Sequence, residues 1–174
     1  ASTALKNLGL DARTAGAAAA ELYSNMTMFK SASAAARTEL TLFVGKIGEA
    51  GIDMRTTTAY MQTLTQALGM GRGQAMQATS SFINMAQALQ LNVNSALQQA
   101  NQLLPQLAKY GQRATTVLQG LAAQSRASGL AMTTLFGVAA RFDTFESAAT
   151  AVGRLNGLLG GPYPVSYTHL RAHE

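Results

Sequence analysis

The chain has 174 residues, enough for one ordinary domain or part of one, and a formal net charge of +5 from 13 Lys and Arg against 8 Asp and Glu. Its residues are 48% hydrophobic but only 12% charged and 6% aromatic, and the absence of Cys excludes disulfide frameworks and thiolate metal sites. Much of the hydrophobic share is Ala, which buries little area, so we expect a thin core. Because only 12% of the residues are charged, we also expect a weakly charged surface, which suits packing in an assembly.

Two kinds of partner are disfavoured by the arrangement of residues. The basic residues are spread almost singly along the chain, so we expect no specific nucleic-acid site. No apolar run reaches the roughly 18 to 20 residues of a membrane span, because the nearest one, at 120–142, is interrupted by Gln124 and Arg126. The chain starts with Ala1 rather than Met, and we expect it to be a fragment or a processed piece of a longer protein.

Helical periodicity dominates the whole chain, with almost no alternating strand pattern. We therefore predict an all-α fold of long amphipathic helices and helical hairpins, extended or loosely bundled, without a sheet. The first helix is expected to start at Asp11 as N-cap, and apolar side chains then recur every three or four residues from Ala19 to Ile47. This stripe predicts one helix of about 36 residues. A hairpin that breaks at KSAS, residues 30–33, is the alternative.

Shorter helices are predicted after this stripe. In the segment 51–69, Asp53 is the expected N-cap and Gly69 the expected stop. The apolar stripe between them consists of Tyr60, Met61, Leu64 and Leu68. Similar segments follow at 71–91, 92–110, 111–128 and 129–142. Their starts recur at intervals of roughly twenty residues, which suggests an array of helical hairpins without a fixed sequence repeat.

A second apolar stripe runs from Phe82 to Leu107 in alternating steps of four and three residues, which is typical of a coiled coil. Asn92 and Asn94 favour a break within it, and Pro105 disfavours a continuous helix. We therefore expect two packed helices with a kink, and core packing within a helical domain rather than a coiled coil.

The sequence offers few groups for catalysis. The carboxylates before the C-terminal segment are Asp11, Glu21, Glu39, Glu49, Asp53, Asp143 and Glu146. Asp143 and Glu146 have the spacing of a helix capping box, and no sequence pattern places two of the others in one cleft. A lone glutamate acting as the acid of a cell-wall glycosidase is an alternative. We expect no catalytic residues, no cofactor and no metal site, and predict that the chain is not an enzyme.

Two further patterns are interpreted as structural. GMGRGQA, at 69–75, has glycines spaced as GxGxG and follows a predicted helix, so it predicts a turn between helices rather than a phosphate-binding loop. The methionines fall mainly at predicted core positions, where a flexible side chain fills gaps between helices.

The last eleven residues, PVSYTHLRAHE, differ in composition from the rest and contain both histidines of the chain. His169 and His173 are four residues apart, a spacing that on a helix could present two zinc ligands, but no third ligand is apparent. SYTHLRAHE resembles translated sequencing-adaptor sequence. We therefore expect residues 1–163 to be a helical segment and 164–174 to be a non-native, disordered tail.

The segment FDTFESAATAVGRLNGLLGGPY, at 142–163, carries a resemblance to a known family. Together with the preceding residues from Asn84, it resembles the helical region of phage tail tape measure proteins. In that family a capped, Phe-containing helix leads into an L-N-x-x-L-G-G segment. The matching residues here are Leu155, Asn156, Leu159, Gly160 and Gly161.

This resemblance implies a structural protein that acts as a length ruler inside the tail tube. It implies contacts with tail tube and baseplate proteins and with tail assembly chaperones, and a place in the virion after assembly in the host cytoplasm. We also expect self-association. The alternative is a bacterial helical-bundle interaction module or membrane-active module, which the amphipathic stripes and the positive charge favour.

Overall fold

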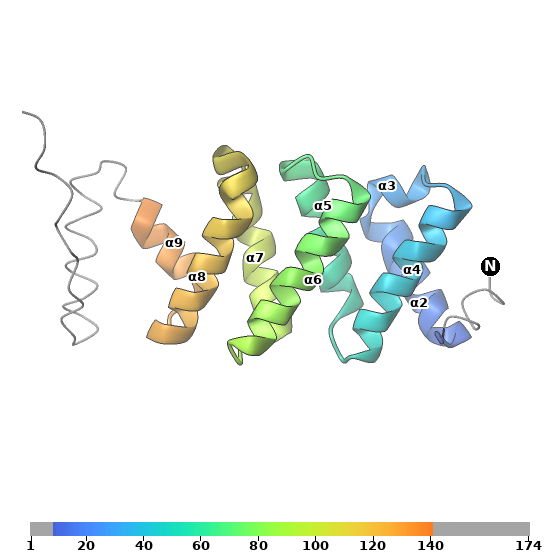
Figure 1. Cartoon of the computed structure of the whole chain (residues 1–174), viewed down its shortest axis with the longest axis horizontal. Helices are drawn as coiled ribbons and strands as arrows, with labels where there is room; N and C mark the ends of the chain where they lie inside the picture. The colour runs from blue at the N-terminus through green and yellow to red at the C-terminus, as the bar shows by residue number, and fades with distance from the viewer. Residues whose placement is uncertain (1–8, 141–174) are drawn as a thin grey trace, which may run out of the picture. The chain divides into compact units, whose positions relative to one another are not determined.

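The computed structural model describes residues 9–140 of the chain (Figure 1). Over this range it contains eight α-helices, one 3-10 helix and no strand, which confirms the predicted all-α fold. The elements are α2 (Ala12–Asn25), α3 (Thr27–Lys30), α4 (Ala34–Glu49), α5 (Met54–Ala67), α6 (Arg72–Ala88), α7 (Val93–Leu107), η1 (Ala108–Arg113), α8 (Ala114–Ser128) and α9 (Met132–Ala140). One compact unit ends at Leu135, and a second begins within α9. The predicted boundary at residue 163 lies outside the described residues.

The unit that ends at Leu135 is a row of three helix hairpins. Hairpin 1 consists of α2 and α4, hairpin 2 of α5 and α6, and hairpin 3 of α7 and α8. The first helices of the hairpins, α2, α5 and α7, pack side by side in one layer, and α4, α6 and α8 form the second layer (Figure 1). Each hairpin therefore contacts mainly its neighbours, as in a helical solenoid. The array of hairpins suggested by the sequence is confirmed.

The single helix of about 36 residues predicted for the N-terminal stripe is wrong, and the alternative hairpin is observed. The chain leaves the helical conformation at Met26, with φ −121° and ψ 105°, and forms the single turn α3. It then starts α4 after Ser33, whose hydroxyl accepts a hydrogen bond from the N–H of Ala36 at 3.2 Å. Arg37 donates to the carbonyls of Phe29 and Lys30 at 3.1 and 2.6 Å and so satisfies acceptors at the end of α3. Folding back buries both halves of the stripe against each other, which a straight helix in water could not do.

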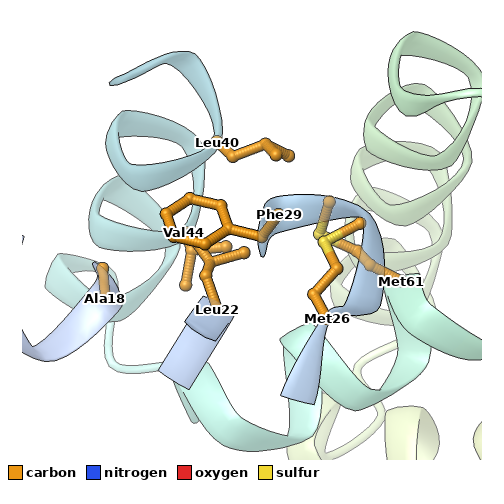
Figure 2. Close-up of a cluster of buried hydrophobic side chains, with 7 residues drawn as sticks. All are labelled: Ala18, Leu22, Met26, Phe29, Leu40, Val44 and Met61. Atoms are coloured by element: carbon orange, nitrogen blue, oxygen red, sulfur yellow. The ribbon is translucent and has the colours of Figure 1, made fainter. Parts of the chain in front are cut away.

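The apolar core of hairpin 1 explains why the chain folds into a hairpin rather than one long helix. Its buried cluster brings together side chains from α2, α3, α4 and α5 (Figure 2). The cluster consists of Ala18, Leu22, Met26, Phe29, Leu40, Val44 and Met61. Truncation of a fully buried leucine such as Leu22 or Leu40 to alanine costs about 2 to 5 kcal/mol, so these contacts outweigh the local preference for a continuous helix. Complete burial of Met26 and Met61 confirms their predicted core positions.

Helix α5 packs between α2 of hairpin 1 and α7 of hairpin 3, and it has the predicted boundaries. Asp53 is its N-cap, accepting a hydrogen bond from the N–H of Thr56 at 2.6 Å, and Gly69 follows its end with φ +64°. Two threonines in its buried face, Thr57 and Thr58, donate to the carbonyls of Asp53 and Arg55 at 2.8 and 3.0 Å. These bonds satisfy the hydroxyls, so a polar side chain can take the place of an apolar one in the core.

The stripe from Phe82 to Leu107 is divided between two helices, so within residues 9–140 it forms no continuous coiled coil. Helix α6 ends at Ala88, Gln90 adopts φ +56° in the turn, and Asn92 caps α7 by accepting from the N–H of Ser95 at 2.9 Å. The predicted break and the predicted use of the stripe in core packing are thus both confirmed. Pro105 lies in the last turn of α7, just before η1.

Candidate functional site

The carboxylates named from the sequence occupy the ends and surfaces of helices. Asp11 caps α2: its Oδ1 accepts from the N–H groups of Arg13 and Thr14 at 2.8 and 2.9 Å, and its Oδ2 accepts from the Thr14 hydroxyl at 2.6 Å. The Thr14 bonds hold the pKa of Asp11 below its usual 3.8, and hydrogen bonding by Thr56 does the same for the pKa of Asp53. Both groups are therefore ionised caps at neutral pH, a state that suits neither for donating a proton.

The three glutamates of the described residues make polar contacts, two of them each within one helix and one between α4 and α6. Glu21 accepts from the side-chain amide of Asn25 at 2.8 Å, Glu39 pairs with Arg72 at 3.1 Å, and Glu49 pairs with Lys46 at 3.0 Å. Exposed pairs of this kind stabilise by about 0 to 1 kcal/mol. Between residues 9 and 140 no three acidic, His or Cys side chains gather in a metal-binding group. Asp143, Glu146, His169 and His173 lie outside the described residues.

One concave feature of the described residues is a groove between α6 and α8, with a volume of about 470 Å³. Its floor contains Tyr60 and Phe82, whose ring centroids are 5.4 Å apart with planes tilted by 33°. The α5–α6 turn closes one end; it contains Gly69 and Gly71 of GMGRGQA, as predicted, whereas Gly73 lies in the first turn of α6. On the other side Gly111, with φ +55° and ψ −128°, turns the chain from η1 toward α8. A non-glycine residue would be strained there.

Amide and hydroxyl groups form the walls of this groove. Gln74 and Gln77 line it from α6, and Thr115 and Gln119 line it from α8. Among the described lining residues, Tyr60 alone has an ionisable side chain, and burial raises its pKa above the usual 10, so it stays neutral. Such walls both donate and accept hydrogen bonds but supply no nucleophile or base.

The sequence analysis did not identify this groove, although a signal for it exists. Gln74, Gln77 and Ser81 recur at steps of three and four, beside the stripe of buried positions Ala75, Thr79 and Phe82 of the same helix. A regular polar stripe of uncharged residues is easily taken for ordinary solvent-facing surface. Only the position of α8 beside α6 makes it one wall of a groove.

None of the helices between residues 9 and 140 has both the length and the apolar character that crossing a bilayer requires. No protein-family model matches the chain, and neither a curated protein nor a solved structure matches it.

Proposed function

We propose that this chain is a structural segment of a phage tail protein that acts as a length ruler inside the tail tube. The observation that carries the proposal is the resemblance of residues 84–163 to tape measure proteins, above all the Leu155-Asn156 and Gly160-Gly161 pattern. The expected partners are tail tube and baseplate proteins and tail assembly chaperones, with self-association of the chain. The expected location is the tail lumen of the virion.

The architecture of the described residues agrees with a structural role. Hairpins stacked in a row add length with each repeat of the same packing, and each hairpin depends on its neighbours for part of its core. The groove between α6 and α8 presents amides and hydroxyls, which suit a polar contact with another chain. The bonds already described tie the carboxylates to caps and surface pairs, so they support packing rather than chemistry.

The test is the length of tails built with an altered segment. Deleting codons 9–140 in frame, in the phage whose tail protein contains this segment, should shorten the tails seen by electron microscopy. If the segment is drawn out as helix in the tail, about 130 residues at about 1.5 Å each remove roughly 200 Å. If it stays folded as three hairpins spaced about 10 Å apart, the loss is only about 30 Å.

A tandem duplication of the same codons should lengthen tails by the same amount, and a Gly120→Ala substitution, which keeps the residue count, should leave the length unchanged. Tails of unaltered length in both the deletion and the duplication would contradict the ruler function of this segment. They would favour the second candidate, a helical interaction module, for which the amphipathic stripes and the net charge of +5 are the motivating observations.

A further inference from the structure

The alternating directions of the helices bring three connections to the same edge of the hairpin array. Residues 26–33 connect the helices of hairpin 1, residues 68–71 connect those of hairpin 2, and η1 connects those of hairpin 3 (Figure 1, top). We call these connections and the helix ends that adjoin them the upper edge. The links between hairpins, at 50–53 and 89–92, lie at the opposite, lower edge.

The upper edge collects basic side chains that are far apart in the sequence. Five basic residues occupy it, with Glu21 and Glu39 as the carboxylates near them in the described residues. The basic residues are Lys30, Arg37, Arg72, Lys109 and Arg113. The sequence contains a signal for this imbalance, because no Asp or Glu occurs between Asp53 and Asp143. The lower edge is mixed, with Asp11, Glu49 and Asp53 close to its own basic residues.

Structural roles account for two of these five cations. Arg37 is held by the carbonyls of Phe29 and Lys30, and Arg72 pairs with Glu39. Lys30, Lys109 and Arg113 are exposed, and the ion pairs of the described residues include none of them. Helix dipoles favour a lysine after a helix C-terminus but disfavour Arg113, which directly precedes α8. The stability of the fold therefore does not explain the whole cluster.

Two exposed aromatic rings lie on the same edge. The side chains of Tyr23 and Tyr110 are 60% and 44% exposed, the largest values among the bulky hydrophobic residues at 9–140. Lys30 Nζ lies 5.3 Å from the centroid of the Tyr23 ring, and Lys109 Nζ lies 5.2 Å from that of Tyr110. Each ring thus has an ammonium beside it, and the two pairs are separated by two helix spacings, or about 20 Å.

We propose that the upper edge binds single-stranded nucleic acid without sequence specificity. Exposed rings flanked by cations provide stacking faces for unpaired bases and positive charges for phosphates, the combination by which single strands are bound. Even at the spacing of about 3.4 Å per nucleotide of a duplex strand, roughly six nucleotides cover the span of about 20 Å, so a single strand of about twelve is long enough. An acidic protein partner is less favoured, because a protein interface needs an apolar centre and the exposed bulky side chains of this edge are the two tyrosines.

The test measures binding of the 174-residue chain to fluorescent oligo(dT) of roughly twelve nucleotides by anisotropy over a range of salt concentrations. The triple variant Lys30→Gln, Lys109→Gln, Arg113→Gln should bind at least about tenfold more weakly, and the slope of log affinity against log salt should fall by about two. The matched control Arg13→Gln, Arg55→Gln, Arg126→Gln removes the same charge from the lower edge and should lose less than about threefold. The pair Tyr23→Leu, Tyr110→Leu should lose about tenfold with an unchanged slope.

Circular dichroism should show the same helicity for all variants, because every substituted side chain is exposed. Equal losses in the two triple variants would overturn the proposal, since binding would then follow net charge alone. No effect of the tyrosine pair, or equal affinity for a duplex of the same length, would overturn the stacking role. Competition by polyglutamate as effective as that by oligo(dT) would assign the edge to an acidic protein instead. All of these binding results are independent of tail length, so the nucleic-acid proposal and the ruler function can fail separately.

Discussion

Asn94 of α7 accepts a 2.9 Å hydrogen bond from the backbone N–H of Asp53, the residue that caps α5. The bond joins the starts of two helices that are 41 residues apart in sequence and neighbours in one layer. Further along the same two helices, the Thr63 hydroxyl and the side-chain oxygen of Asn101 are also hydrogen-bonded. Side-chain amides of α7 therefore fix the position of α5 at two levels, in addition to the apolar contacts.

Replacement of Asn94 by alanine should lower the free energy of unfolding by about 1 kcal/mol, because it removes the acceptor for a backbone N–H between two helices. Urea unfolding followed by circular dichroism measures the difference. Gln98→Ala is the matched control on the same helix, since the Gln98 side chain is exposed, and it should cost less than about 0.5 kcal/mol. Equal effects of the two substitutions would show that the Asp53–Asn94 bond does not stabilise the hairpin array.

The two aspartate caps should make stability depend on pH in acid. The pKa values of Asp11 and Asp53 are lowered from 3.8 in the folded chain, by Thr14 and Thr56 respectively, so the unfolded chain binds protons first as pH falls. The stabilisation by these caps is fully present above the unfolded pKa and is lost as pH drops through the folded values, in the window below about pH 4.

The variant Asp11→Asn, Asp53→Asn keeps good capping residues but removes both titrating groups. Its melting temperature should fall less steeply than that of the parent chain below about pH 4, and should differ little near pH 7. Parallel curves for the two proteins throughout the acid range would contradict the assignment of the pH dependence to these caps.

How far the sequence predicts this fold depends on whether a feature is local. The caps Asp11 and Asp53, the stop at Gly69 and the break at Asn92 follow from side chains that bond to backbone groups a few residues away. These were all correctly predicted. The hairpin in the first stripe depends instead on contacts such as Leu22 with Leu40 and Val44, which periodicity cannot distinguish from one continuous apolar face.

The same distinction explains what was missed at the surface. Gln77 and Gln119 form one groove only because two helices far apart in sequence lie side by side. Lys30 and Lys109 look isolated along the chain, and the alternating helix directions place them on one edge. Spacing in sequence therefore did not disclose the clustering of charge, although the long stretch without acidic residues did point to an imbalance.

Gly45 in α4 should not tolerate a larger side chain. A Cβ atom there would lie 2.5 Å from Cδ2 and 2.9 Å from Cδ1 of the buried Leu10. Gly45→Ala therefore forces either the Leu10 side chain or the backbone of α4 to move. Overpacking of this kind costs about 1 to 3 kcal/mol, against about 1 kcal/mol gained in helix propensity. We expect a net loss of stability in thermal unfolding, up to about 2 kcal/mol.

Gly120, within α8, is the matched control for that substitution. A Cβ atom there meets nothing within 4 Å, so Gly120→Ala should stabilise the chain by about 0.5 to 1 kcal/mol. The two changes are chemically identical, and opposite signs are expected. Stabilisation by both would mean that Leu10 does not pack against α4 as described.

The hairpin formed by α2 and α4 can be measured directly, because the chain has no native Cys to interfere with labelling. Ala12 and Ala50 are exposed at the start of α2 and just after α4, and nearby the Nζ of Lys46 donates to the carbonyl of Gly9 at 2.6 Å. Spin labels on Ala12→Cys and Ala50→Cys should therefore be on the order of 20 Å apart in pulsed electron resonance, as expected for adjoining ends of two packed helices. A continuous helix would separate the same positions by about 57 Å. A dominant distance near the longer value would contradict the hairpin and favour the single helix. A mixture of both distances would mean that hairpin 1 opens in solution, as a ruler drawn out inside a tube would require.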